Sequence, residues 1–101
     1  MDELLEEFIA ETRETLAALA EEILLWEVDP ADRQRLDAIF RFVHTVKGSC
    51  GFLDLPRLER LSNAAEDVLS DARSGKRTPD KPLVDAVLAI VDRIGEIVEA
   101  I

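Results

Sequence analysis

The sequence predicts an all-α fold: one domain over residues 1–101, built as an antiparallel up-down-up-down bundle of four helices. Three observations favour this fold. Apolar residues recur at steps of three and four along nearly the whole chain, as on the buried face of an amphipathic helix. Segments containing proline or glycine divide this pattern into four stretches of similar length, and no stretch alternates as a half-buried strand does. Because the links are short, consecutive helices should run antiparallel.

The first helix is expected over about residues 2–27, with its acidic residues mostly off the apolar stripe. Asp29 and Pro30 interrupt the pattern, and the second helix is expected over about residues 30–53. The predicted core stripes are Leu5, Phe8, Thr12, Leu16, Leu19, Ile23 and Trp26 in the first helix, and Leu36, Ile39, Val43, Val46, Cys50 and Leu53 in the second.

The third helix is expected over residues 56–74, because Pro56 suits a first turn and Gly75 suits a helix end. A polar loop follows, and Thr78 or Asp80 is expected to cap a fourth helix over about residues 80–101. The predicted core stripes are Leu58, Leu61, Ala65, Val68 and Ala72 in the third helix, and Leu83, Val87, Ile90, Ile94, Ile97 and Ile101 in the fourth.

Composition and charge exclude several classes of function. The net charge of −10 argues against a nucleic-acid partner. No apolar run is long enough to span a membrane, and the acidic opening of the chain does not resemble a secretory signal, so we expect a cytoplasmic protein without membrane insertion. One cysteine and one histidine cannot form an internal disulfide or a zinc site, so no metal ligands are predicted.

The single histidine, His44, marks the stretch in which we expect the function to lie. With Lys47, Gly48 and Gly51 it forms a stripe beside the apolar one on the second helix. Two glycines in a helix cost about 1 kcal/mol each relative to alanine, which suggests that another molecule approaches the backbone here. Residues 30–77, which contain this stripe, are also the only segment that is not acidic, with seven acids and nine bases. This balance indicates either tolerance for added negative charge or an ordinary solvated surface.

An antiparallel turn near residue 54 would place residue 44 level with residue 64, so that Ser62, Asn63 and Glu66 can face the histidine. Glu66 is the strongest candidate partner, because a carboxylate that accepts one imidazole N–H leaves the other ring nitrogen as a nucleophile. Lys47 supplies a positive charge where an oxyanion could sit.

Each of these residues also has an ordinary structural interpretation. His44 and Lys47 could be solvated surface residues, and Glu66 could pair with Arg60 or Arg73. Cys50 is expected in the core, whereas Phe42 and Phe52 could be core residues or an exposed patch. No hydrolytic triad and no glycine-rich loop that would hold ATP is evident.

Residues 44–53, HTVKGSCGFL, resemble the HxxKG signature of histidine phosphotransfer domains, most closely the N-terminal phosphotransfer domain of CheA-type chemotaxis histidine kinases. Residues 2–12 and 58–69 are also similar to that family. The resemblance implies that His44 accepts a phosphoryl group from the ATP-binding domain of a histidine kinase. His44 would then donate it to an aspartate of a response-regulator receiver domain.

The resemblance also assigns roles to the residues around His44. Glu66 would orient His44, Lys47 would lie near the phosphoryl oxygens, and Gly48 would open the approach. Asn63 stands where the family often has a second histidine. We expect the receiver to bind around His44, Gly48, Gly51, Asn63 and the turn that begins at Phe52.

No cofactor is expected in this domain, because ATP and Mg²⁺ would bind to the kinase domain and Mg²⁺ to the receiver. The chain would then be the phosphoacceptor domain of a kinase and have no ATP site of its own. Two alternatives remain: a helical module used only for docking or dimerisation, and an enzyme that uses His44 as a general base.

Overall fold

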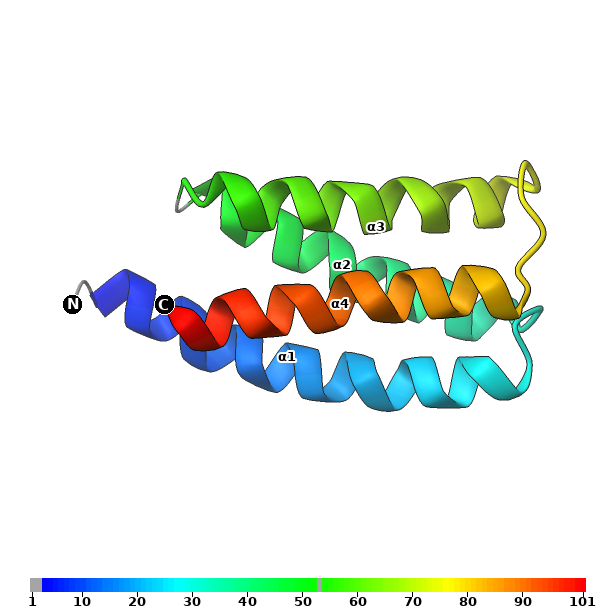
Figure 1. Ribbon diagram of the computed structural model, residues 1–101, viewed down its shortest axis with the longest axis horizontal. Helices are drawn as coiled ribbons and strands as arrows, with labels where there is room; N and C mark the ends of the chain where they lie inside the picture. Colours follow the sequence, from blue (N-terminus) through cyan, green and yellow to red (C-terminus); the bar gives the residue numbers. More distant parts are fainter. Residues whose placement is uncertain (1–2, 53) are drawn as a thin grey trace.

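The computed structural model describes residues 3–52 and 54–101, without the side chain of Phe52, and folds them as four helices (Figure 1). Helix α1 spans Glu3–Val28, α2 Arg33–Phe52, α3 Pro56–Ser74 and α4 Lys81–Ala100. The molecule measures 42 × 22 × 19 Å, and the start of α1 and the end of α4 lie at the same end of its long axis. The described part of the chain contains no strand, so the predicted all-α class is confirmed.

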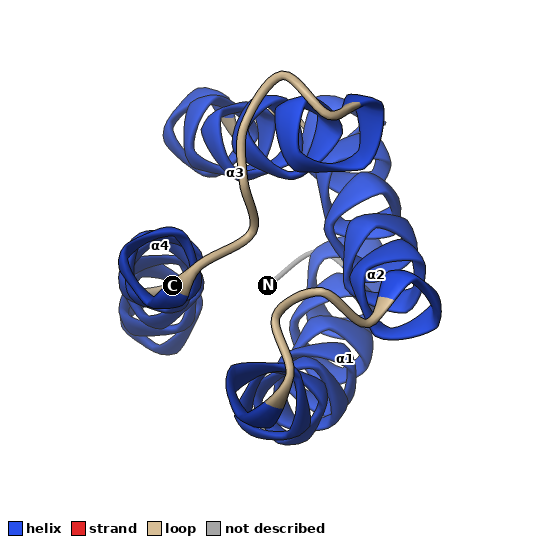
Figure 2. Ribbon diagram, turned by 90° about the vertical axis from the view of Figure 1, so that its right-hand side faces the viewer, coloured by secondary structure: helices blue, strands red, loops and turns tan. Residues whose placement is uncertain are grey.

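The helices form an up-down-up-down bundle in which each packs on its neighbours in sequence and α4 returns to α1 (Figure 2). Two apolar clusters fill the centre. The larger is built around Trp26, Ile39 and Leu69, and the smaller around Phe8, Cys50 and Leu58. Among the described residues, no helix has the length and apolar content required to cross a membrane.

Helix α2 begins at Arg33, three residues after the predicted start. The backbone first turns between Asp29 and Asp32, where the Asp32 N–H donates to the Asp29 carbonyl at 3.0 Å. The Asp32 carboxylate then accepts from the N–H groups of Gln34 and Arg35 at 3.1 and 3.2 Å. Asp32 is thus an N-cap, and it sets the start of the helix more strongly than Pro30 does. The predicted last residue, Leu53, lies outside the described part.

Both ends of the loop between α3 and α4 have the predicted chemistry. Gly75 ends α3 in the left-handed conformation, with φ of 83°, and donates to the Ala72 carbonyl. Asp80, rather than Thr78, caps α4 by accepting from the Leu83 N–H at 3.0 Å. Helix α4 therefore spans 81–100 within the predicted 80–101.

The buried faces of α3 and α4 are rotated from the predicted stripes. On α3 Ser62 and Leu69 are fully buried, whereas Leu61 and Val68 are only partly buried. On α4 Val84, Val91 and Val98 replace Ile90, Ile97 and Ile101 in the centre. Because apolar residues occupy two adjacent stripes on each helix, periodicity alone did not distinguish the stripe that faces the core.

Candidate functional site

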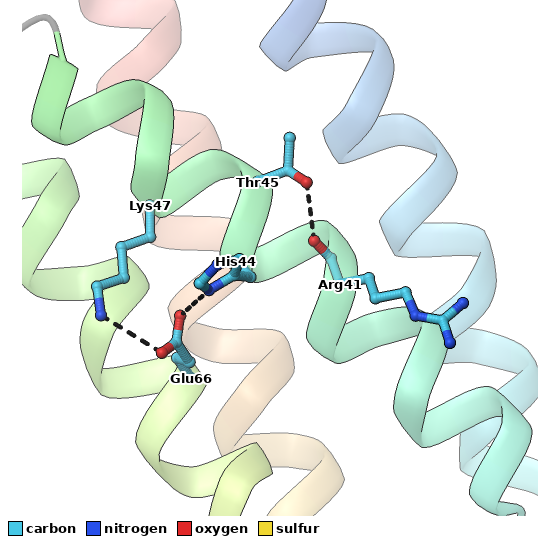
Figure 3. Close-up of polar contacts among 5 residues, drawn as sticks. All are labelled: Arg41, His44, Thr45, Lys47 and Glu66. Carbon is cyan, nitrogen blue, oxygen red and sulfur yellow. Dashed lines mark hydrogen bonds and ion pairs between the residues drawn. The ribbon is translucent and has the colours of Figure 1, made fainter.

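His44 and Glu66 meet across the interface between α2 and α3 (Figure 3). His44 Nδ1 lies 2.9 Å from Glu66 Oε2, a hydrogen-bond distance. The His44 side chain is 67 % exposed, whereas that of Glu66 is 17 % exposed. An exposed imidazole is therefore held by a mostly buried carboxylate, as the antiparallel arrangement of the two helices predicts.

Lys47 contacts the same carboxylate from one turn further along α2 (Figure 3). Its Nζ lies 3.3 Å from Glu66 Oε1, so each oxygen of Glu66 has its own partner. Burial raises the pKa of Glu66, but the hydrogen bonds from His44 and Lys47 and the Lys47 charge outweigh it, and the pKa falls below the usual 4.5. Glu66 is consequently ionised at neutral pH.

An ionised Glu66 determines which nitrogen of His44 carries the proton. A carboxylate can only accept hydrogen bonds, so the Nδ1 that faces it must donate an N–H. In a neutral imidazole the lone pair then lies on Nε2, on a side chain that is largely open to solvent. The site thus presents a nucleophilic nitrogen, because the Glu66 carboxylate sets the tautomer of the imidazole.

A surface hollow of about 470 Å³ lies beside His44, between α2 and the first turns of α1. Glu7 and Glu11 line it from α1, and none of the described residues that line it is a lysine or an arginine. Lys47, by contrast, reaches towards α3. A phosphoryl group at His44 would therefore be repelled on the α1 side and attracted on the Lys47 side. The hollow is lined by Leu4, Glu7, Phe8, Glu11, His44, Thr45, Gly48 and Ser49.

The two glycines of the predicted stripe have different surroundings. Gly48 lies beside the His44 hollow, and a methyl group added there would meet no atom within 4 Å. Gly51 faces α3, where an added methyl group would lie 3.9 Å from the Glu59 carboxyl. Packing within the bundle does not require glycine at position 48, so the open backbone there fits an approaching partner.

Two further residues, Asn63 and Phe52, were predicted to bind the partner. Asn63 is exposed and lines a separate hollow with Lys47, Pro56, Glu59 and Arg60. The side chain of Phe52 is outside the described part of the structure. Two residues outside the predicted binding set belong to the core. Phe42, whose place the sequence left open, is partly buried and packs against the larger core cluster. Cys50 is fully buried as expected, and burial raises the pKa of its thiol to about 11.

Sequence reasoning missed an aromatic contact at His44 and a cation that packs on the same aromatic ring. The Phe40 ring is stacked on the imidazole, with centroids 6.1 Å apart and planes 10° from parallel. The Arg73 guanidinium lies 4.3 Å from the centroid of Phe40 and pairs with Asp37, not with Glu66. The spacing of four residues between Phe40 and His44 was the available signal, because such residues share a helix face.

Comparison with known proteins identifies what this bundle is similar to. The family model described as the Hpt domain matches residues 3–97. The chain is 36 % identical over 99 residues to the chemotaxis protein CheA of Treponema pallidum, covering 98 % of this chain and 12 % of that protein. It is 40 % identical over 94 residues to the sensor histidine kinase CheAY of Helicobacter pylori, covering 91 % and 12 %.

A solved structure agrees with these matches. The CheA phosphotransferase domain from Thermotoga maritima superposes with a TM-score of 0.91 at 29 % sequence identity, covering 99 % of this chain and 97 % of that one. The chain thus spans about an eighth of the length of the curated relatives above and nearly all of this isolated domain.

Proposed function

This chain belongs to the Hpt domain family and is homologous to CheA phosphotransfer domains, and from that premise we propose that His44 is its phosphoacceptor. The observation that carries the proposal is the contact between His44 Nδ1 and the ionised Glu66 at 2.9 Å. This contact leaves Nε2 of an exposed side chain as the nucleophile.

In the proposed reaction, the Nε2 lone pair forms a bond to the γ-phosphorus of ATP as the P–O bond to ADP breaks. Nδ1 keeps its proton, so the ring becomes a positively charged phosphoimidazolium. The Glu66 carboxylate faces that developing charge and stabilises it. In the second step, an aspartate oxygen of the receiver attacks the phosphorus, the N–P bond breaks and the ring returns to neutral.

Lys47 would act on the phosphoryl oxygens in this scheme. It is 32 % exposed and lies close to Glu66, so its flexible ammonium can turn towards an incoming phosphoryl group without leaving the site. Glu7 and Glu11 on the opposite wall favour approach from the Lys47 side. The bundle would contribute orientation and electrostatics, and the partners would contribute the phosphoryl chemistry.

The partners of the reaction belong to the proposal as well. We assign ATP and Mg²⁺ to the catalytic domain of a histidine kinase, and a second Mg²⁺ site to a response-regulator receiver domain. The open backbone at Gly48 supports docking of both partners on the α2 side of the bundle. We further propose that these reactions take place in the cytoplasm, where ATP is available.

The test is to incubate the protein with a histidine-kinase catalytic domain, Mg²⁺ and radiolabelled ATP. We expect label on the chain that is stable in base and lost in acid, and that a receiver domain removes. The protein with Mg²⁺ and ATP alone should remain unlabelled. His44→Gln should stay folded, because His44 lies outside the core, and should take no label.

Two results would contradict the proposal. Labelling of His44→Gln would move the acceptor elsewhere, with Thr45 and Ser49 the nearest hydroxyl candidates. Labelling without any kinase domain would show that the chain is an enzyme in its own right.

A further inference from the structure

The His44 imidazole has a second neighbour besides Glu66. Phe40 lies one turn earlier on α2, and its ring is stacked on the imidazole with centroids 6.1 Å apart and planes 10° from parallel. Helical side chains lean towards the N-terminus of their helix, so a side chain at position 44 leans over the turn that contains position 40. His44 is thus contacted by an aromatic ring from its own helix and a carboxylate from α3.

Phe40 is itself held from two helices. Its ring is partly buried and packs against the larger core cluster. The Arg73 guanidinium of α3 lies 4.3 Å from the ring centroid, which is a cation–π distance. Arg73 Nε in turn pairs with Asp37 Oδ1 of α2 at 2.8 Å. These contacts fix the Phe40 ring against the bundle, whereas His44 is largely exposed.

We propose that Phe40 is a positioning residue for His44, and that Arg73 acts through it. The inference rests on the proposed function of His44 as a nucleophile. A single hydrogen bond from Nδ1 to Glu66 leaves the imidazole free to tilt about that bond. A flat neighbour that packs parallel to the ring removes this freedom, so that Phe40 and Glu66 together determine the plane of the imidazole.

The plane of the ring matters because the Nε2 lone pair lies in it. In-line transfer requires that lone pair to point at the phosphorus along the axis of the breaking bond. An imidazole that tilts spends less time aligned, which lowers the rate of the chemical step. Binding of the kinase or receiver domain need not change, because Phe40 acts on the orientation of the nucleophile.

The experiment compares Phe40→Leu with Phe40→Tyr and with Phe42→Leu as the matched control. Phe42 is also a partly buried phenylalanine of α2 and packs against the same core cluster, but it lies beside Ala38, Arg41 and Thr45. Two quantities are measured: the side-chain rotamer populations of His44 by NMR, and the initial rate of phosphorylation by phosphoramidate. This small donor gives up its phosphoryl group to Nε2 and releases ammonia, so docking of a kinase domain does not affect the rate.

We expect Phe40→Leu to populate additional His44 rotamers and to slow phosphorylation by roughly 2- to 10-fold, as loss of an aromatic pair implies. Phe40→Tyr, which keeps the aromatic ring, should retain a single His44 rotamer and the wild-type rate of phosphorylation. Phe42→Leu should lose stability without changing either measurement. A wild-type rotamer and rate in Phe40→Leu, or an equal loss in Phe42→Leu, would overturn the proposal.

The role of Arg73 is tested by combining substitutions. Arg73→Gln alone should slow the reaction in the same direction as Phe40→Leu, and it should add nothing once Phe40 is already leucine. A full additional loss in the double variant would show that Arg73 acts independently of Phe40 and would remove it from the proposal.

Failure of the proposed function would have a different signature. If wild type took no phosphate from phosphoramidate or from a kinase domain, His44 would not be the acceptor. The NMR rotamer measurement would still decide whether Phe40 orients the imidazole.

Discussion

Replacing Glu66 with alanine should slow phosphorylation of His44 by about 10- to 100-fold while the bundle stays folded. The structure sets this magnitude. Glu66 Oε2 accepts from His44 Nδ1 at 2.9 Å, and hydrogen bonds to charged groups contribute about 1.5 to 3 kcal/mol. Because the His44 side chain is 67 % exposed, water replaces part of the lost contact. A loss of about 1.4 to 2.7 kcal/mol in transition-state stabilisation corresponds to that range of rates.

The assay measures initial rates with a fixed kinase domain and saturating ATP, and urea unfolding shows that each variant is folded. Glu66→Gln keeps an acceptor oxygen and loses only the charge, so its rate should fall between those of Glu66→Ala and wild type. Asp67→Asn is the matched control, since it removes the same charge from the next, exposed position of α3. A wild-type rate in Glu66→Ala would refute the orienting role of Glu66. If Asp67→Asn lost as much rate as Glu66→Ala, the effect would be one of net charge and not of orientation.

Three further predictions concern other residues of α2. Lys47→Ala should slow phosphorylation by about 3- to 10-fold, because it removes the cation and leaves the Glu66 charge uncompensated. The phosphorylation rate of Lys47→Arg should stay near that of wild type, and equal rates for wild type, Lys47→Ala and Lys47→Arg would exclude an electrostatic role of Lys47. Gly48→Arg should slow transfer from a kinase domain far more than transfer from phosphoramidate, because the open backbone beside His44 is then covered; equal slowing with both donors would contradict a docking role. Cys50, with a thiol pKa raised by burial to about 11, should resist iodoacetamide at pH 8 and react only when urea unfolds the chain; rapid alkylation of the native protein would show that this part of the core opens readily.

Much of the fold and of the site follows from local signals in the sequence. The apolar stripes and the link near residue 54 were enough to place His44 opposite Glu66, since an antiparallel pair of helices has only one register for a short connection. The caps at Gly75 and Asp80 carry the usual residue types for their positions.

The remaining features depend on how the helices rotate about their own axes, which periodicity does not determine. Ser62 appeared suited to the polar stripe near His44, but it is fully buried while Leu61 is only partly buried. The contact of Arg73 with Phe40 and Asp37 joins side chains more than 30 positions apart, and each has a plausible surface role in the sequence. Only the packed bundle shows that Arg73 contacts both residues and that one of them, Phe40, stacks on the imidazole.

The central claim is that Nε2 of His44 receives the phosphoryl group while Nδ1 remains bonded to Glu66. The most direct measurement is a ¹⁵N and ³¹P NMR spectrum of the protein labelled on its single histidine and phosphorylated by a kinase domain. We predict phosphorus coupled to Nε2 and a protonated Nδ1. Phosphorus on Nδ1, or on a hydroxyl with the histidine resonances unchanged, would contradict the claim.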